Sequence, residues 1–233
     1  MQDLRTSRLY VYNCLMLYHS YIFFDSESSI NELSKIALEK AKTAFITCVE
    51  KSADVRVRPY ATLAFKTGTR CMLHFNGKTP DAIQLLVRDL LHTALGAHVR
   101  IAYTLLGLTR TSQYNPNHPP KEAAWDMSHR YLVVYPFTKT TEWHLMPYDE
   151  RRSVMKAHVD VGRKHSEEIS QMLLYSYGID DHEFIVSYQM NDLEAFQTLV
   201  MEMRETESRR HTKNDLPIFT CIHMPLLEAL DML

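Results

Sequence analysis

The residue whose type and setting most clearly allow chemistry is His158, which lies in a helical pattern beginning at Pro147 and reaching about His165. It follows Val154 by four residues and precedes Val161 by three, so it projects from the apolar face. No second metal-binding side chain stands three or four residues away on that face, which argues against a zinc or di-iron cluster. A single imidazole suits the iron of a porphyrin, because the macrocycle supplies four further donors. A core histidine bonded to a neighbour is the competing interpretation.

A tyrosine and a lysine share one face of a predicted strand over residues 130–138 and the residue after it. Alternate side chains of a strand point the same way, so one face carries Tyr131, Val133, Tyr135, Phe137 and Lys139. Pro136 lacks an N–H group, which indicates a strand edge or a bulge. A buried phenol can give an electron and a proton to a strong oxidant. An ordinary half-buried strand with a solvated terminal lysine is the alternative.

Three further polar residues have both a functional and a plain interpretation. Gln171 begins a predicted strand, and a buried amide without partners costs about 1–3 kcal/mol, so it needs a partner, a wet cavity or solvent. Arg204 lies in the last turn of a predicted helix, where a cation complements the helix dipole. Arg163, near the end of the His158 helix, allows the same explanation. Either arginine becomes a binding residue only beside an anion.

These residues stand on elements that occur in the same order twice. The first half predicts a strand at 10–18, a helix at 30–50, strands at 60–66 and 70–75, a helix at 79–96 and a strand at 98–106. The second half predicts a strand at 130–138, a helix at 147–165, strands at 169–177 and 183–189, a helix from 191 to about 204 and a strand at 218–222. Each half is β-α-β-β-α-β, the ferredoxin-like arrangement. The fold class is therefore α+β, with two such sheets stacked or joined edge to edge into a barrel.

The two halves predict a domain division at a long central loop. Residues 1–111 form the N-terminal ferredoxin-like half, 112–128 a connecting loop and 129–233 the C-terminal half. The loop contains Asn-Pro and Pro-Pro pairs, and a loop of this length in a compact chain is often a lid over a site.

Composition excludes several classes of protein. The formal net charge of -2 is made of interspersed opposite charges, so nothing favours a nucleic acid or an anionic membrane as partner. The four cysteines show no C-x-x-C spacing, which favours free thiols in a reducing compartment. The apolar segment 9–24 faintly resembles a signal peptide but contains Asn13, His19 and Ser20 and lacks a small-residue cleavage site. No stretch predicts a membrane span, and we expect a cytoplasmic protein.

Several of these residues belong to one longer pattern over residues 130–219. It comprises Tyr135-Pro136-Phe137-Thr138-Lys139, Glu142-Trp143, Glu150-Arg151-Arg152, His158, Gly162-Arg163, Gln171, Gly178-Ile179-Asp180-Asp181, Glu183-Phe184 and Glu202-Met203-Arg204. In order and spacing this set resembles the chlorite dismutase superfamily, and within it the coproheme decarboxylases. The first half of the chain resembles the family only in the order of its elements.

The resemblance implies a haem enzyme with the porphyrin in the C-terminal half and a homo-oligomeric ring, usually a pentamer. Its reaction would be the peroxide-dependent oxidative decarboxylation of two coproheme propionates, which gives haem b through a tyrosyl radical. His158 then matches the proximal iron ligand, Tyr135 the tyrosine that forms the radical, and Lys139 the lysine near the reacting propionate. Arg204 matches an arginine that anchors a propionate, and Arg163 is grouped with it as substrate-binding.

Gln171 stands where the chlorite-decomposing members carry a distal arginine. A neutral amide cannot supply the positive charge that holds an anionic oxidant, so this position favours decarboxylation. His144, Arg209 and the segment 223–230 depart from the decarboxylase pattern. The alternatives are a chlorite-degrading or peroxidase-like haem enzyme, a non-catalytic haem-binding protein on the same scaffold, and a haem-free ferredoxin-like interaction protein.

Overall fold

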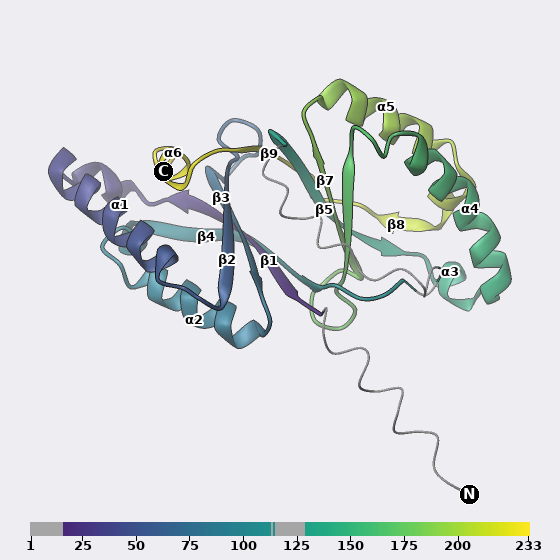
Figure 1. Cartoon of the computed structure of the whole chain (residues 1–233), viewed down its shortest axis with the longest axis horizontal. Coiled ribbons are helices and arrows are strands. Elements are labelled where there is room, and N and C mark those ends of the chain that lie inside the picture. The colour runs from purple at the N-terminus through teal and green to yellow at the C-terminus, as the bar shows by residue number, and fades with distance from the viewer. Residues whose placement is uncertain (1–15, 113, 115–128) are drawn as a thin grey trace, which may run out of the picture.

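The computed structural model describes residues 16–112, 114 and 129–233 (Figure 1). Its strands are β1 (Tyr18–Ser26), β2 (Val55–Ala61), β3 (Cys71–Gly77), β4 (Val99–Leu108), β5 (Tyr131–Lys139), β6 (Ser170–Tyr175), β7 (Phe184–Met190), β8 (Thr212–Asn214) and β9 (Phe219–His223). Its α-helices are α1 (Lys35–Glu50), α2 (Pro80–Leu91), α3 (Thr141–Leu145), α4 (Tyr148–Lys164), α5 (Leu193–Arg204) and α6 (Leu226–Leu230). Short 3-10 helices are η1 (Ser28–Glu32), η2 (Gly96–His98) and η4 (Glu207–His211). Apart from residues 112 and 114, the predicted connecting loop lies outside the described residues.

Each half of the chain has the ferredoxin-like strand order. The first half runs β4-β1-β3-β2 and the second β9-β5-β7-β6, with antiparallel neighbours throughout. The halves meet at two edges, where Tyr60 pairs with His223 and Leu108 with Tyr175. Because β5 and β7 also pair, the sheet closes into a barrel. The predicted α+β fold of two ferredoxin-like halves is confirmed, in its edge-joined form.

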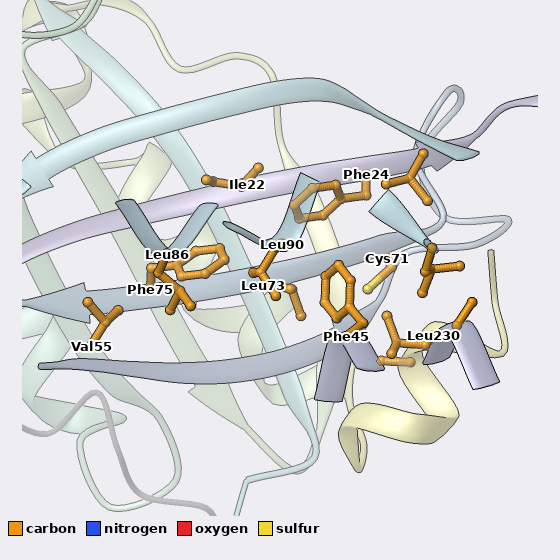
Figure 2. Packing of buried hydrophobic residues seen from close by; sticks show 14 of the residues in the cluster. Ile22, Phe24, Phe45, Val55, Cys71, Leu73, Phe75, Leu86, Leu90 and Leu230 are labelled. Carbon is orange, nitrogen blue, oxygen red and sulfur yellow. The ribbon is translucent and has the colours of Figure 1, made fainter. Parts of the chain in front are cut away.

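The barrel separates three apolar clusters. Its interior is filled by side chains from both halves, among them Tyr21, Phe23, Leu132, Val134 and Phe219. The outer face of the first half is covered by α1, α2 and α6, and Figure 2 shows Phe45, Leu86 and Leu230 packed with Leu73 and Phe75 of β3. The outer face of the second half carries the third cluster, under α4 and α5 on the opposite flank in Figure 1.

Most of the first predicted strand, at 10–18, lies outside the described residues. The first strand within them is β1, which covers Tyr18–Ser26. Residues His19 to Phe24 are all buried, because β1 has the barrel interior on one side and the helices on the other. A strand that is buried on both faces loses the alternation of apolar and polar residues that identifies a half-exposed strand.

The second predicted strand is displaced. It was expected at 60–66, but β2 covers Val55–Ala61, and the chain turns after Thr62 with a positive φ of 68° at Ala64. The sequence did not predict a strand here because the segment contains Arg56, Arg58 and Pro59, and charged residues and proline are depleted in sheets.

Pro136 lies where the pairing of β5 changes partner. On one side β5 pairs with β9 up to Val134 and with β8 from Thr138, and a register shift separates Thr138 from Lys139. The irregularity that the proline predicted is therefore present. This irregularity interrupts the regular pairing of β5 just before Lys139.

Some predicted helices were too long, and several short elements were missed. The helix predicted at 30–50 is divided, since η1 ends at Glu32 and α1 begins at Lys35 with Ser34 as its cap. The helix predicted to reach Gly96 ends at Leu91. The missed elements include α3, η4, β8 and α6, each of five residues or fewer, a length at which periodicity carries little signal.

A buried histidine pair joins β1 and β3. His19 Nδ1 lies 2.9 Å from His74 Nε2, and Asn76 Nδ2 lies 3.0 Å from His19 Nε2. Burial lowers the pKa of His19 to about 3 and places that of His74 well below its ordinary value. Both rings are therefore neutral in the folded protein at pH 7.

We predict that these histidines make the fold sensitive to acid. Histidines of the unfolded chain take up protons below about pH 6.5, while folded His19 stays neutral to about pH 3. The free energy of unfolding therefore decreases as the pH is lowered through this window, by about 1.4 kcal/mol per pH unit for each such histidine. In His19→Gln the pH slope of the free energy of unfolding, measured by denaturant titration between pH 6.5 and 5, should be smaller by that amount.

His92→Gln, which changes an exposed histidine at the end of α2, is the matched control and should keep the wild-type slope. An unchanged slope in His19→Gln would contradict the prediction.

Candidate functional site

Helix α4 is held at the edge of the second half with its apolar face only partly covered. Asp149 and Glu150 in its first turn and Arg163 and Lys164 in its last complement the helix dipole. It packs chiefly against α5 and η4, and no residue of α4 is fully buried. The apolar face of α4 is therefore only partly buried. It carries Val154, Met155, His158 and Val161.

His158 is a neutral imidazole with one nitrogen engaged. Its Nδ1 lies 3.1 Å from Ser208 Oγ of η4. Burial, with a smaller contribution from the charge of Lys139, lowers the pKa of His158 to about 4. Among the described residues, Nε2 makes no hydrogen bond. A neutral imidazole of this kind can offer a lone pair to a metal.

Lys139 is held at the end of β5 by several contacts. Its backbone N–H donates to Glu183 Oε2 over 2.8 Å, and its ammonium lies 3.4 Å from Thr212 Oγ1 and 4.7 Å from the Trp143 ring centroid. Burial and, to a smaller extent, the charge of Arg209 lower the pKa of Lys139 to about 8, while Glu183 opposes the shift. This cation loses its proton at a lower pH than an ordinary lysine.

Tyr135 belongs to the outward face of β5, in the apolar cluster that α5 covers. Its ring lies 6.1 Å from that of Tyr188, at 24° to it, on the neighbouring strand. Burial raises the pKa of the Tyr135 phenol, while a hydrogen bond with Tyr188 and the nearby Arg204 and Arg209 lower it. The raised pKa keeps the phenol protonated at neutral pH.

Two arginines share one carboxylate beside this tyrosine. Arg204 Nη2 lies 3.1 Å and Arg209 Nη1 2.8 Å from Asp215 Oδ2. The three charges leave a net positive charge, and both arginine side chains are more than a third exposed. The pair can therefore meet an anion that arrives from solvent.

The remaining predicted residues lie farther from this group. Gln171 is exposed at the start of β6 and pairs in register with Tyr188 of β7. Arg163 is 72% exposed at the end of α4, where its guanidinium lies 3.7 Å from Asp160. Within the described residues, no hydrogen bond or ion pair joins Arg163 to His158, Tyr135 or Lys139.

Comparisons with known proteins agree with this fold. The sequence profile described as Chlorite dismutase matches residues 34–224. The chain belongs to the chlorite dismutase family. It is 26% identical over 200 residues to the coproheme decarboxylase of Mycolicibacterium smegmatis, covering 85% of this chain and 86% of that one.

Solved structures of the family have the same fold. The chlorite dismutase of Candidatus Nitrospira defluvii in complex with imidazole superposes with a TM-score of 0.85 at 22% identity, over 92% of this chain and 94% of that one. A mutant of the same enzyme gives 0.86 at 22% identity over the same shares.

Within this family member, the site includes residues that the sequence did not identify. Ser208 and Asp215 stand in or beside short elements without periodicity, and in the sequence Glu183 is only one member of the family pattern. Arg209 is, in the sequence, only a departure from the decarboxylase pattern. A hydroxyl bonded to a histidine 50 positions away leaves no local signal in a sequence.

The surroundings of His158 fit a flat apolar group better than a metal ion held by protein alone. In residues 16–112, 114 and 129–233, no group of three His, Cys, Asp or Glu side chains could hold a metal ion. The surface of the sheet under α4 and α5 is apolar and only partly buried. Tyr135, Phe137 and Leu173 lie on it. The cations Lys139, Arg204 and Arg209 lie beside Tyr135 or His158 and suit carboxylates on the same group.

None of the helices in the described parts of the chain is both long and apolar enough to cross a membrane.

We predict that Arg209 depresses the pKa of Lys139. In Arg209→Gln the Lys139 ammonium loses a repulsive neighbour, so its pKa should rise from about 8 towards the ordinary value. Titration of isotopically methylated lysines by NMR measures this directly. Arg210→Gln removes an exposed neighbouring charge, 80% exposed and paired with Glu207, and is the control. Equal behaviour of the two variants would refute the prediction.

Proposed function

We propose that this chain binds an iron porphyrin through Nε2 of His158 and converts coproheme to haem b by peroxide-dependent decarboxylation of two propionates. The observation that carries the proposal is a neutral, half-buried imidazole on an apolar face, whose Nε2 makes no hydrogen bond within the described residues. It belongs to a group of residues that includes a half-buried phenol and three cations. The similarity to a coproheme decarboxylase supports the choice of substrate.

The bound iron porphyrin would supply the oxidising power by reacting with peroxide. The protein would supply orientation, local charge and one redox-active side chain. For each propionate the balance is R–CH2CH2–COO⁻ + H2O2 + H⁺ → R–CH=CH2 + CO2 + 2 H2O. Two electrons and one proton leave the propionate side chain, and the peroxide becomes two waters.

Tyr135 would carry the first oxidation. Its phenol gives up one electron and its proton, and the resulting tyrosyl radical takes a hydrogen atom from the β-carbon of the propionate. The hydrogen atom restores the phenol, so the tyrosine is regenerated. The raised pKa of Tyr135 fits this role, because the proton stays on the oxygen until the electron leaves.

The cations would position the carboxylates. Lys139, with its lowered pKa, can both attract a carboxylate and exchange a proton near neutral pH. Arg204 would anchor a propionate in place of its present partner, Asp215. Arg163 stays a candidate substrate-binding residue only through the family resemblance. Gln171 would give a neutral, hydrogen-bonding side chain on the distal side.

The assembly and location belong to the same proposal. A homo-oligomer, by resemblance a pentamer, in the cytoplasm accords with the family pattern. The N-terminal half over 1–111 would support the haem-binding half over 129–233.

The decisive experiment mixes the protein with coproheme, adds peroxide in steps and follows products by mass. We expect two successive losses of one carboxyl unit, ending at haem b. Oxygen release from chlorite at the expense of this reaction would favour the chlorite-degrading alternative instead. Uptake of haem b without turnover would favour a haem-binding protein.

Tyr135→Phe should keep coproheme binding and abolish CO2 release, because the phenyl ring fills the same space but has no oxygen to lose a proton. Binding is measured by the Soret band and turnover by mass. Tyr131→Phe, on the same face of β5, should retain turnover. An active Tyr135→Phe enzyme would rule out the radical role.

His158→Ala should weaken the iron bond and change the absorption spectrum of the porphyrin complex. His165→Ala changes the histidine directly after the same helix, whose Nε2 lies 3.4 Å from Glu202 Oε2, and should leave the spectrum as it is. A wild-type spectrum in His158→Ala would remove the proximal assignment.

A further inference from the structure

The hydrogen bond of His158 continues into a chain of hydroxyl groups that ends on a backbone carbonyl. His158 Nδ1 lies 3.1 Å from Ser208 Oγ, Ser208 Oγ lies 2.9 Å from Thr206 Oγ1, and Thr206 Oγ1 lies 2.7 Å from the carbonyl oxygen of Met203. Ser208 is 3% exposed, so its hydroxyl is shielded from water. The chain joins α4 to the end of α5 through η4.

The number of hydrogens that each group carries decides which partner donates in each of these hydrogen bonds. A carbonyl oxygen can only accept, so the Thr206 hydroxyl uses its one hydrogen on Met203. The hydrogen between Thr206 and Ser208 must then come from Ser208. Ser208 has no second hydrogen, so His158 Nδ1 must donate to it. A neutral imidazole that carries its proton on Nδ1 has its lone pair on Nε2.

The anchor of this chain is fixed by the end of a helix. Met203 lies one residue before the last residue of α5, where carbonyl groups form the negative end of the helix dipole. Its carbonyl also accepts the backbone N–H of Thr206 over 3.2 Å. Thr206 precedes η4, yet its side chain does not cap that helix. Its hydroxyl is engaged by Met203 and Ser208 instead.

We propose that Ser208 and Thr206 are positioning residues that hold His158 in its Nδ1–H tautomer and so make Nε2 the iron-binding atom. This inference rests on the proposed function for its purpose, but not for its geometry. The acceptor on Nδ1 is a neutral hydroxyl. It therefore orients the ring without drawing the proton away as a carboxylate would, and the ligand stays a neutral imidazole.

The relay is the chain of hydrogen bonds from His158 through Ser208 and Thr206 to the carbonyl of Met203. Its first test needs no porphyrin. NMR of the apo full chain labelled with 15N-histidine reports which ring nitrogen carries the proton, and the signals of His158 are those missing in His158→Gln. We expect a single Nδ1–H tautomer at pH 7. A predominant Nε2–H tautomer would overturn the proposal.

Two variants break the relay at different links. Ser208→Ala removes the acceptor, and Thr206→Val keeps the shape but frees the Ser208 hydrogen to point at His158. Both should give a mixture of tautomers, and Thr206→Val should shift furthest towards Nε2–H. Thr198→Val is the matched control on α5, where another threonine donates to a backbone carbonyl, that of Glu194, at an exposed site. Unchanged His158 signals in both relay variants would overturn the proposal.

A second readout uses haem b as the probe, without turnover. If only half of the imidazoles carry the competent tautomer, the apparent affinity falls about twofold. The iron–histidine stretching band of the ferrous complex should also broaden or shift in Ser208→Ala and Thr206→Val, but not in Thr198→Val. An identical band in all variants would count against the relay.

The relay and the decarboxylase activity can be refuted separately. A single Nδ1–H tautomer that both relay variants disturb, in a protein that releases no CO2 from coproheme, would keep the relay and remove the decarboxylase. Release of CO2 by a protein whose His158 signals ignore Ser208 and Thr206 would keep the decarboxylase and remove the relay.

Discussion

The candidate site depends on the register of β5 in a closed sheet. Val133 and Tyr135 face outward beneath α5, while Leu132 and Val134 fill the barrel interior. β5 is hydrogen-bonded to β7 on one side and to β9 on the other, so its alternation is set from both edges. A slip by one residue would turn Tyr135 into the barrel and bring Val134 out. The position of the phenol therefore follows from barrel closure as much as from the strand that carries it.

The sequence predicted the second half better than the first, and the reason is burial. In residues 130–204, α4, α5 and the outward side of β5 keep partly exposed positions, so their periodicity can be read from the sequence, and all three lie near their expected positions. The sequence does not predict β1 and β2 at their observed positions, because both faces of β1 are buried and β2 contains Arg58, which is 1% exposed inside the fold. Periodicity fails where the environment is apolar on all sides or polar on the inside.

For the site, side-chain type and face could be predicted, but contacts across the chain could not. The sequence indicated that His158 points to an apolar face and that Tyr135 and Lys139 share one side of a strand. It gave no sign that Ser208 would meet His158 or that Asp215 would join Arg204 to Arg209. Ser208 lies in η4 and Asp215 directly follows β8, and both elements are too short for periodicity to predict them. The family pattern supplied the expected roles of single residues, and the fold supplied the partners that set their charge and orientation.

The C-terminal residues return to the half in which the chain began. Ala229 and Leu230 of α6 are fully buried in the core under α1, and Lys42 of α1 lies 2.7 Å from Asp231. Just before them, β9 is a strand of the other half and pairs with β5 as well as β2. The last fifteen residues thus fasten the two halves together independently of the segment that links them in sequence. Severing the backbone between the halves would leave two fragments that still share a sheet and a core, whereas removing the tail would expose the edge of β2 and part of the core beneath α1.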